Sequence, residues 1–231
     1  EILIGLVGSE MCIRDSIKGV IWYQGEANVG RSEQYGDLFP ALITDWRRQW
    51  RSDFPFYFVQ LANFMESKKI QPDSEWAALR EAQTKALKLD QVGMAVTIDI
   101  GLADDIHPKN KQEVGRRLAL VALAGSYGKN VSSSAPVFQN YIIKGNKMEL
   151  DFGQKQDGFQ IKGTTLKGFT IAGPDRVFYP AEAMVHDGKI ILSSTEVPAP
   201  LAARYGWADN PDCNLYGENG LPVAPFRTDC W

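Results

Sequence analysis

Residues 93–120 read GMAVTIDIGLADDIHPKNKQEVGRRLAL and contain the pattern that decides the fold. The run 93–100 is apolar almost throughout, which is typical of a strand buried on both faces of a parallel sheet. Asn110 and Glu113 have capping-box spacing, so we expect a helix from there to about residue 127. Its buried stripe consists of Val114, Leu118 and Val121. The stretch therefore predicts a strand, a polar loop and a helix.

The same alternation precedes this stretch. Runs of β-branched and aromatic residues predict strands at 18–23 and 56–61. Apolar residues at helical spacing predict helices at 40–51 and 75–88, the second capped by Ser74. Strands that alternate with helices indicate a parallel sheet with right-handed crossovers.

The pattern changes near residues 132–134, which are all serine. Beyond them short apolar runs are separated by Gly, Asn, Asp and Pro, which predicts a small antiparallel β domain. The runs lie at 141–144, 147–152, 169–171 and 189–192. From Pro198 onward little periodicity remains, and we expect an ordered extended tail that packs over one of the domains.

Residues 1–16, EILIGLVGSEMCIRDS, have no charged region ahead of their apolar run, unlike a signal peptide. They look like a translated sequencing-adapter tail, in which Ser9, Cys12 and Ser16 have no function. The alternative is a genuine strand at 2–7. We divide the chain into this adapter-like tail, an α/β domain at 17–130, and a β-sandwich-like domain with its extended tail at 131–231.

Composition excludes several classes of protein. The 231 residues are 44% hydrophobic and 23% charged with a net charge of -3, which is typical of a globular protein. Lys and Arg are not clustered as in nucleic-acid-binding proteins, and the apolar runs are too short to span a bilayer. Three cysteines without a Cys-x-x-Cys pair argue against a structural zinc site. Cys213 and Cys230 form either one disulfide or two free thiols.

The strongest chemical feature is Asp104 three residues before His107, on the loop between the strand and the helix. Open α/β sheets place their sites on such loops. In this spacing the aspartate orients one ring nitrogen and leaves the other free as a general base. Pro108 stiffens the backbone directly after the histidine. The alternative is a surface Asp-His pair without a role.

A second feature follows the first clear strand. Gln24 offers an amide donor for an oxyanion, and Gly25 lets a substrate approach the backbone. Glu26 and Asn28 are positioned to fix this loop by hydrogen bonds. The alternative is a turn whose polar residues only satisfy the backbone.

Together these blocks resemble the sialate O-acetylesterase family, within the SGNH (GDSL-like) hydrolases. The resemblance runs in family order from about residue 17 to the end. It is carried by KGVIWYQGEANVGR (18–31), LFPALITDWRRQW (38–50), PFYFVQLANF (55–64), WAALREAQTKAL (76–87), residues 93–120 as quoted above, and RYGWADNPDCNLYGENGLPVAPFRTD (204–229).

The resemblance implies an incomplete SGNH (flavodoxin-like) three-layer parallel-sheet domain followed by a small antiparallel β domain. It implies a secreted or periplasmic serine-type esterase, without metal or cofactor, that removes acetyl groups from sugar hydroxyls. His107 matches the general base and Asp104 the orienting acid, with Asp105 in reserve. Gln24 and Gly25, with Glu26 beside them, match the oxyanion block.

The resemblance also implies a missing part. The family's nucleophilic serine lies in an upstream Gly-x-Ser block that nothing before Ile17 matches, and Ser32, Ser52 and Ser67 stand in the wrong chain order. We therefore expect a fragment that lacks the N-terminal half of the same protein and is inactive alone. The residue run 18–23 is then an exposed sheet edge, a feature that favours self-association.

The sequence also allows alternative functions for the chain and alternative roles for several residues. An acetylxylan-type esterase and a non-catalytic carbohydrate-binding module at 131–231 are the alternative functions. His186, beside Asp187 and Gly188, indicates a surface hairpin. Two further groups either serve the site or are structural. They are Arg80 and Gln83 on the predicted helix 75–88, and Arg204, Trp207 and Asn214 in the tail.

Overall fold

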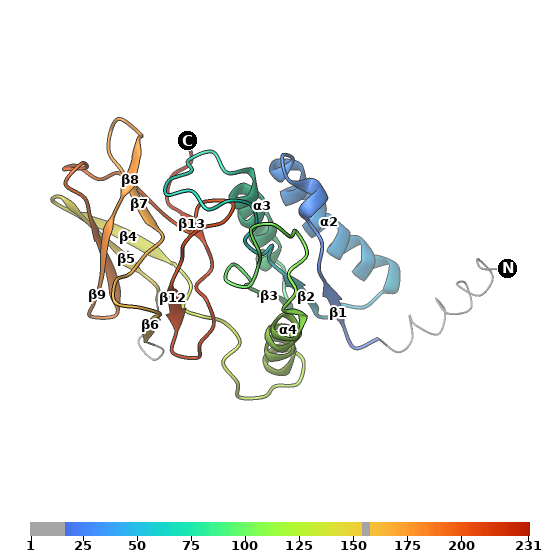
Figure 1. Cartoon of the computed structure of the whole chain (residues 1–231). Coiled ribbons are helices and arrows are strands. Elements are labelled where there is room, and N and C mark those ends of the chain that lie inside the picture. Colours follow the sequence, from blue (N-terminus) through green and yellow to red (C-terminus); the bar gives the residue numbers. More distant parts are fainter. Residues whose placement is uncertain (1–16, 154–157) are drawn as a thin grey trace.

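The computed structural model describes residues 17–153 and 158–231. The expectations for residues 1–16 therefore lie outside the described residues. Figure 1 shows an α/β part, built from the N-terminal half of the described chain, beside a part made of β-strands. The C-terminal end of the chain lies between the two parts.

The α/β part is centred on a parallel three-stranded sheet. Its strands are β1 (Val20–Trp22), β2 (Phe56–Val59) and β3 (Val92–Ala95), in the order β1-β2-β3. The parallel sheet agrees with the prediction, but the third strand ends five residues earlier than expected. The chain leaves the ladder because it turns after Thr97. The backbone carbonyl of Thr97 accepts from the Ile100 N–H, and its hydroxyl donates to the Gln60 carbonyl at 2.6 Å.

Helices cover both faces of this sheet. They are α2 (Ser32–Trp50), α3 (Glu75–Thr84) with the 3-10 turn η2 (Lys85–Lys88), and α4 (Lys111–Gly125), preceded by the short 3-10 turn η1 (Glu26–Asn28). Phe56 and Phe58 of β2 pack with α2 and α3, whereas Tyr57 and Val59 pack with α4. This alternation produces the expected three layers, because successive strand residues point to opposite faces.

Helix boundaries follow the predicted caps with one exception. Asn110 accepts a hydrogen bond from the Glu113 N–H at the start of α4, and Ser74 caps α3 through the Ala77 N–H. The predicted start of the helix at residue 40 is wrong, because α2 begins at Ser32. Its buried stripe already includes Tyr35 and Phe39, and the helix continues through Pro40. A proline inside a helix removes one backbone hydrogen bond and crowds the preceding turn, a cost that the packing of Tyr35, Phe39 and Ile43 in the core offsets.

The β part contains three antiparallel sheets. Their orders are β4-β5-β10-β9, β13-β11-β7-β8 and β12-β6. The strands are β4 (Asn140–Lys144), β5 (Lys147–Asp151), β6 (Phe159–Ile161), β7 (Phe169–Ala172), β8 (Phe178–Pro180), β9 (Glu182–His186), β10 (Lys189–Ser193), β11 (Ala202–Tyr205), β12 (Leu215–Gly217) and β13 (Phe226–Arg227). Met148, Leu150, Ile171 and Ile190 are fully buried in its core.

The C-terminal tail differs from its prediction. It does not only pack over a domain, because it contributes β11, β12 and β13, and β11 lies between β13 and β7. Sequence periodicity missed these strands because they are only two to four residues long. Cys213 and Cys230 are both free, which decides between the two alternatives above.

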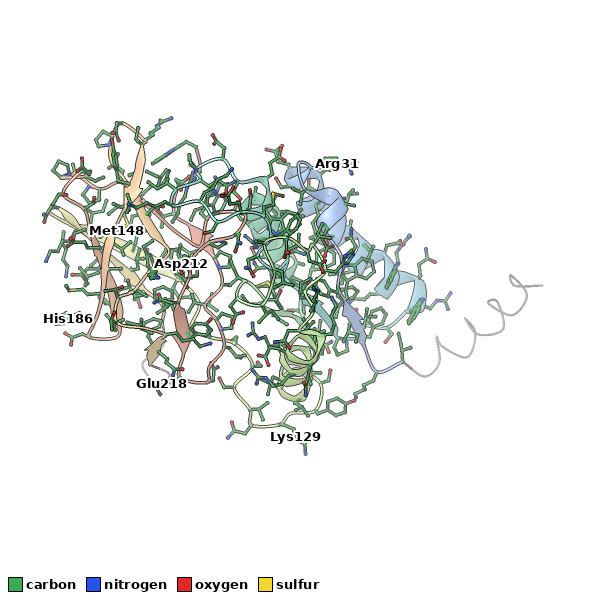
Figure 2. All side chains as sticks on the ribbon, in the orientation of Figure 1. Arg31, Lys129, Met148, His186, Asp212 and Glu218 are labelled. Carbon is green, nitrogen blue, oxygen red and sulfur yellow. The ribbon has the colours of Figure 1, made fainter. Side chains whose placement is uncertain are left out.

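The hairpin prediction for His186 is confirmed. Asp187 and Gly188 connect β9 to β10 with φ values of 49° and 73°, as a two-residue hairpin turn requires. Figure 2 shows His186 at the outer end of the β part. In residues 17–153 and 158–231 no helix is both long and apolar enough to cross a bilayer.

Strand β1 forms an edge of the parallel sheet within the described residues, since it pairs with β2 alone. Ile21 lies opposite Tyr57 and so faces the same side of the sheet as α4. The residue nevertheless stays 69% exposed, so α4 does not cover it. An unpaired strand edge beside an exposed aliphatic side chain favours pairing with another chain.

We expect Ile21→Lys to reduce self-association of the chain, because a lysine on an edge strand opposes pairing with a second edge. Sedimentation velocity over a concentration series measures the effect. Leu38→Lys, on the exposed face of α2, is the matched control and should leave association unchanged. A wild-type chain that stays monomeric throughout the series would contradict the prediction.

Candidate active site

The loops that follow β1, β2 and β3 meet at the carboxyl ends of the parallel strands, where such sheets place their sites. Buried Gln83 of α3 connects the first two loops. Its Oε1 accepts from the Leu61 N–H at 2.9 Å, and its Nε2 donates to the Gln24 carbonyl at 3.2 Å. Gln83 therefore orients loops of the candidate site and does not belong to a solvated helix face.

Asn63 connects the second loop to the third. Its Oδ1 accepts from the Gly101 N–H at 2.7 Å, next to a parallel bridge between Phe64 and Leu102. Its Nδ2 donates to Oδ1 of Asn210 in the tail, also at 2.7 Å. Sequence reasoning missed both asparagines, because no short-range pattern indicates a contact across 147 residues.

The Gly25 turn is fixed by these contacts. Gly25 has φ 152° and ψ -20°, a conformation that side chains disfavour, and an added Cβ would lie 3.1 Å from Nε2 of Gln83. Gln24 donates from Nε2 to Oδ1 of Asn28 at 2.7 Å and accepts from the Tyr35 hydroxyl at 3.2 Å. A primary amide has two N–H donors, so one of them is left for another acceptor.

Glu26 lies next to the half-buried Tyr23. Burial, and then the negative charge of Glu26, raise the pKa of Tyr23 to about 12, so its hydroxyl stays protonated at neutral pH. Lys111, the first residue of α4, lies over the Tyr23 ring at 5.2 Å from its centroid. Ile106, beside the predicted base, also packs against the apolar cluster that Tyr23 joins. The loop after β1 is thus in contact with the segment that carries His107.

His107 is open to solvent, with 84% of its side chain exposed. Its nearest carboxylate is that of Asp105, which accepts from the His107 N–H at 2.9 Å and lies 3.6 Å from Nδ1. This backbone hydrogen bond is the main reason that the pKa of Asp105 is lowered. Asp104 is exposed and makes no hydrogen bond to His107 within the described residues. The structure thus brings the reserve residue to the ring, and the roles of both carboxylates stay predictions.

No serine hydroxyl in residues 17–153 and 158–231 forms a hydrogen bond with the His107 ring. Ser32 begins α2. Ser52 and Ser67 are exposed, and Ser67 lines a cavity that contains none of the predicted site residues. The expected absence of a nucleophile therefore stays a prediction about the upstream sequence.

An ion-pair network anchors the loop that carries Asp104 and His107. Arg117 of α4 is buried and donates to both carboxylate oxygens of Asp99, at 2.6 and 2.9 Å, and to Glu113 at 2.7 Å. The Tyr216 hydroxyl of β12 donates to Asp99 at 3.1 Å, so the β part also holds this loop. The sequence contained a signal for this buried ion pair, because Asp99 is an acidic residue in an otherwise apolar run.

Arg80 of α3 is fully buried and forms no salt bridge with any residue in 17–153 or 158–231. It donates to the Leu61 and Ala62 carbonyls of the loop after β2, at 2.9 and 3.0 Å. It also donates to the Ala208 and Asp209 carbonyls of the tail, at 2.8 and 2.7 Å. Burial lowers its pKa to about 9. Arg80 thus joins the candidate site to the C-terminal tail.

The three tail residues considered as sugar contacts have structural partners. Arg204 forms a bidentate pair with Asp229, and the Trp207 indole donates to the Pro72 carbonyl. Asn214 donates to the Lys162 and Thr165 carbonyls. These contacts favour the structural alternative for Asn214 and leave Arg204 and Trp207 beside a cavity considered below.

Comparison with known proteins identifies the family. The family described as "Carbohydrate esterase, sialic acid-specific acetylesterase" matches residues 7–124, which is 118 of the 231 residues. The chain belongs to this family. All five predicted site residues lie within the match.

Individual proteins that are similar to the chain are also named as acetylesterases. The chain is 32% identical to mouse sialate O-acetylesterase and 31% identical to the human protein, over 91% of its own length. It is 45% identical to a carbohydrate acetylesterase from Xanthomonas citri, whose crystal structure superposes with a TM-score of 0.90 over 95% of this chain. This match confirms the predicted fold class.

The matched relatives of the esterase family are longer than this chain. It covers 44% of the mouse protein, 46% of the human protein and 52% of the Xanthomonas chain. The chain thus spans about half the length of the relatives it matches.

We expect Arg80→Met to destabilise the chain by about 3 kcal/mol or more, because it leaves the buried Leu61 and Ala208 carbonyls without a donor and takes one of two donors from the Ala62 and Asp209 carbonyls. Urea unfolding followed by tryptophan fluorescence measures the change. Arg48→Met, on the exposed face of α2, is the control and should change the free energy of unfolding by less than about 0.5 kcal/mol. An equal effect of the two substitutions would refute a special role for Arg80.

Glu113 predicts a pH dependence of stability. Hydrogen bonds from Arg116, and then Arg117, lower the pKa of Glu113 to about 2 in the folded chain, against the opposing effect of burial. Between roughly pH 5 and pH 2 the unfolded chain therefore binds a proton that the folded chain does not. The free energy of unfolding consequently decreases as the pH is lowered through this range.

Glu113→Gln should consequently be less stable than the wild type at pH 7, and the difference should shrink towards pH 2. Thermal unfolding across this range measures it. Glu33→Gln, an acidic first-turn residue of α2, is the control. A difference between Glu113→Gln and the wild type that is independent of pH argues against this ion pair as the cause.

Proposed function

We propose that the protein containing this chain is a carbohydrate O-acetylesterase that hydrolyses acetyl esters on sugar hydroxyls. Family membership supports the esterase class. One observation supports placing the activity at this site. At the carboxyl ends of the parallel strands, hydrogen bonds of Gln83 and Asn63 connect the Gly25 turn, the loop after β2 and the Gly101 loop. An exposed imidazole on that loop is accessible to a hydroxyl from another segment.

In the proposed mechanism a serine from the remainder of the protein attacks the acetyl carbonyl. His107 takes the serine proton as general base, while a neighbouring aspartate stabilises the imidazolium. His107 then gives this proton to the departing sugar oxygen. The free N–H of Gln24, with backbone amides of the Gly25 turn, donates to the oxyanion. Water, deprotonated by His107, releases acetate and restores the serine.

Sialic acid esters are the first substrate class to test. The matched family is described as sialic acid-specific, and the mouse and human relatives are named sialate O-acetylesterases. The Xanthomonas relative is named only as a carbohydrate acetylesterase. Acetylated xylan is therefore the second class, and release of acetate from each of the two substrates decides between them.

The test joins this chain to the upstream half of a family member and measures acetate release. We expect His107→Ala to reduce kcat by about a thousandfold or more, because a missing base removes the proton acceptor in both steps. His186→Ala is the matched control, since the only other histidine lies at the outer hairpin. Full activity of His107→Ala would contradict the assignment of His107 as the general base.

The same joined protein separates the two carboxylates. If Asp104 orients His107, Asp104→Asn should lower kcat far more than Asp105→Asn, because an amide favours the wrong imidazole tautomer. The reverse order would assign that role to Asp105, whose carboxylate lies 3.6 Å from the ring here. The pH at which kcat is half maximal should shift in the variant that lacks the orienting acid.

A further inference from the structure

A cavity of about 480 Å³ lies between residues 67–72 of the α/β part, strands β7 and β8, and the tail. None of the five predicted site residues lines it. Its volume falls within the range of small-molecule sites. Figure 2 shows Asp212, one of its lining residues, on the inner side of the β part, away from the outer hairpin at His186.

The walls of the cavity are aromatic and firmly held. Phe169, Phe178 and Trp207 line it. Between two of these rings lies the buried guanidinium of Arg204, at 3.9 Å from the Phe178 centroid and 5.0 Å from that of Trp207. The bidentate pair with Asp229 fixes this guanidinium, so the walls are preorganised for a ligand. Rings beside a few polar groups are the usual lining of a site for a small organic molecule.

The cavity carries a net positive charge. Lys167 pairs with Asp212 at 2.8 Å, and Asp229 neutralises Arg204. Lys68 and Lys69 also line the cavity, are exposed, and form no ion pair with any residue that the structure describes. Two cations without partners above aromatic walls are complementary to a sugar that carries a carboxylate.

The tail separates this cavity from the candidate active site. Trp207 and Ala208 line the cavity, whereas Asn210, two residues on, bonds to Asn63, which in turn holds the Gly101 loop. A ligand in the cavity thus contacts the later part of the loop after β2 and the tail, but not the Gly25 turn or the loop that carries His107.

We propose that this cavity is a second, non-catalytic site that binds a carboxylate-bearing sugar unit. The carbohydrate part of this inference rests on the proposed function, and the carboxylate part rests on Lys68 and Lys69. The site retains acidic glycans on the protein, and its position against the tail leaves the reacting loops free for the acetylated unit.

The test is titration of the full 231-residue chain with N-acetylneuraminic acid, followed by chemical shifts of the backbone amides in NMR spectra. We expect shifts at residues 67–72 and 204–212, and about fivefold weaker binding by the double variant Lys68→Ala, Lys69→Ala. The double variant Lys88→Ala, Lys129→Ala removes the same charge elsewhere and should bind like the wild type. The neutral methyl ester of the sugar should bind as weakly as the Lys68, Lys69 variant does to the acid.

Three results would overturn the proposal: no binding by the wild type, equal weakening in the two double variants, or equal binding of the acid and its methyl ester. His107→Ala should leave this binding unchanged. Failure of the proposed function appears separately, as acetate release that persists in His107→Ala within the joined protein.

Discussion

One buried guanidinium organises the chain. Arg80 is 0% exposed and forms no salt bridge with the residues that the structure describes, so its charge is stabilised mainly by four main-chain carbonyls that accept from it, with the nearby charge of Asp209 contributing as well. Two of these carbonyls belong to the loop after β2 and two to the tail. The C-terminal segment is therefore part of the α/β structure as much as of the β part, and neither end of this contact can move without leaving a buried charge or buried carbonyls unsatisfied.

The candidate site combines a rigid frame with exposed reactive groups. Gln83 and Asn63 bond to backbone groups of the strand-end loops, and Gly25 adopts a positive φ at which an added Cβ would lie tightly against Gln83. His107, by contrast, is 84% exposed. This arrangement is compatible with the proposed function, in which the fixed loops hold the geometry and the serine comes from another segment.

The β part also contributes to the site, which distinguishes it from an independent binding module. Its Tyr216 donates to Asp99, which pairs with Arg117 and so anchors the start of the His107 loop. Its tail supplies Asn210 to Asn63. Both contacts join residues more than a hundred positions apart. Substitutions in the β part are therefore expected to reach the candidate active site through these polar contacts rather than through direct contact with substrate.

The sequence by itself determined the alternation of strands and helices, the caps at Ser74 and Asn110, the hairpin at His186 and the family, because each is written in local spacing or in long matching stretches. Tertiary structure alone decided that the tail enters the sheets as strands and that Arg80 is buried. Which of the two adjacent aspartates lies beside the His107 ring depends on the local backbone conformation of the loop, which residue spacing did not resolve. The physical reason is the sequence separation over which each kind of interaction acts. Periodicity and capping act within about four residues, whereas burial and long-range hydrogen bonds depend on which segments the folded chain brings together.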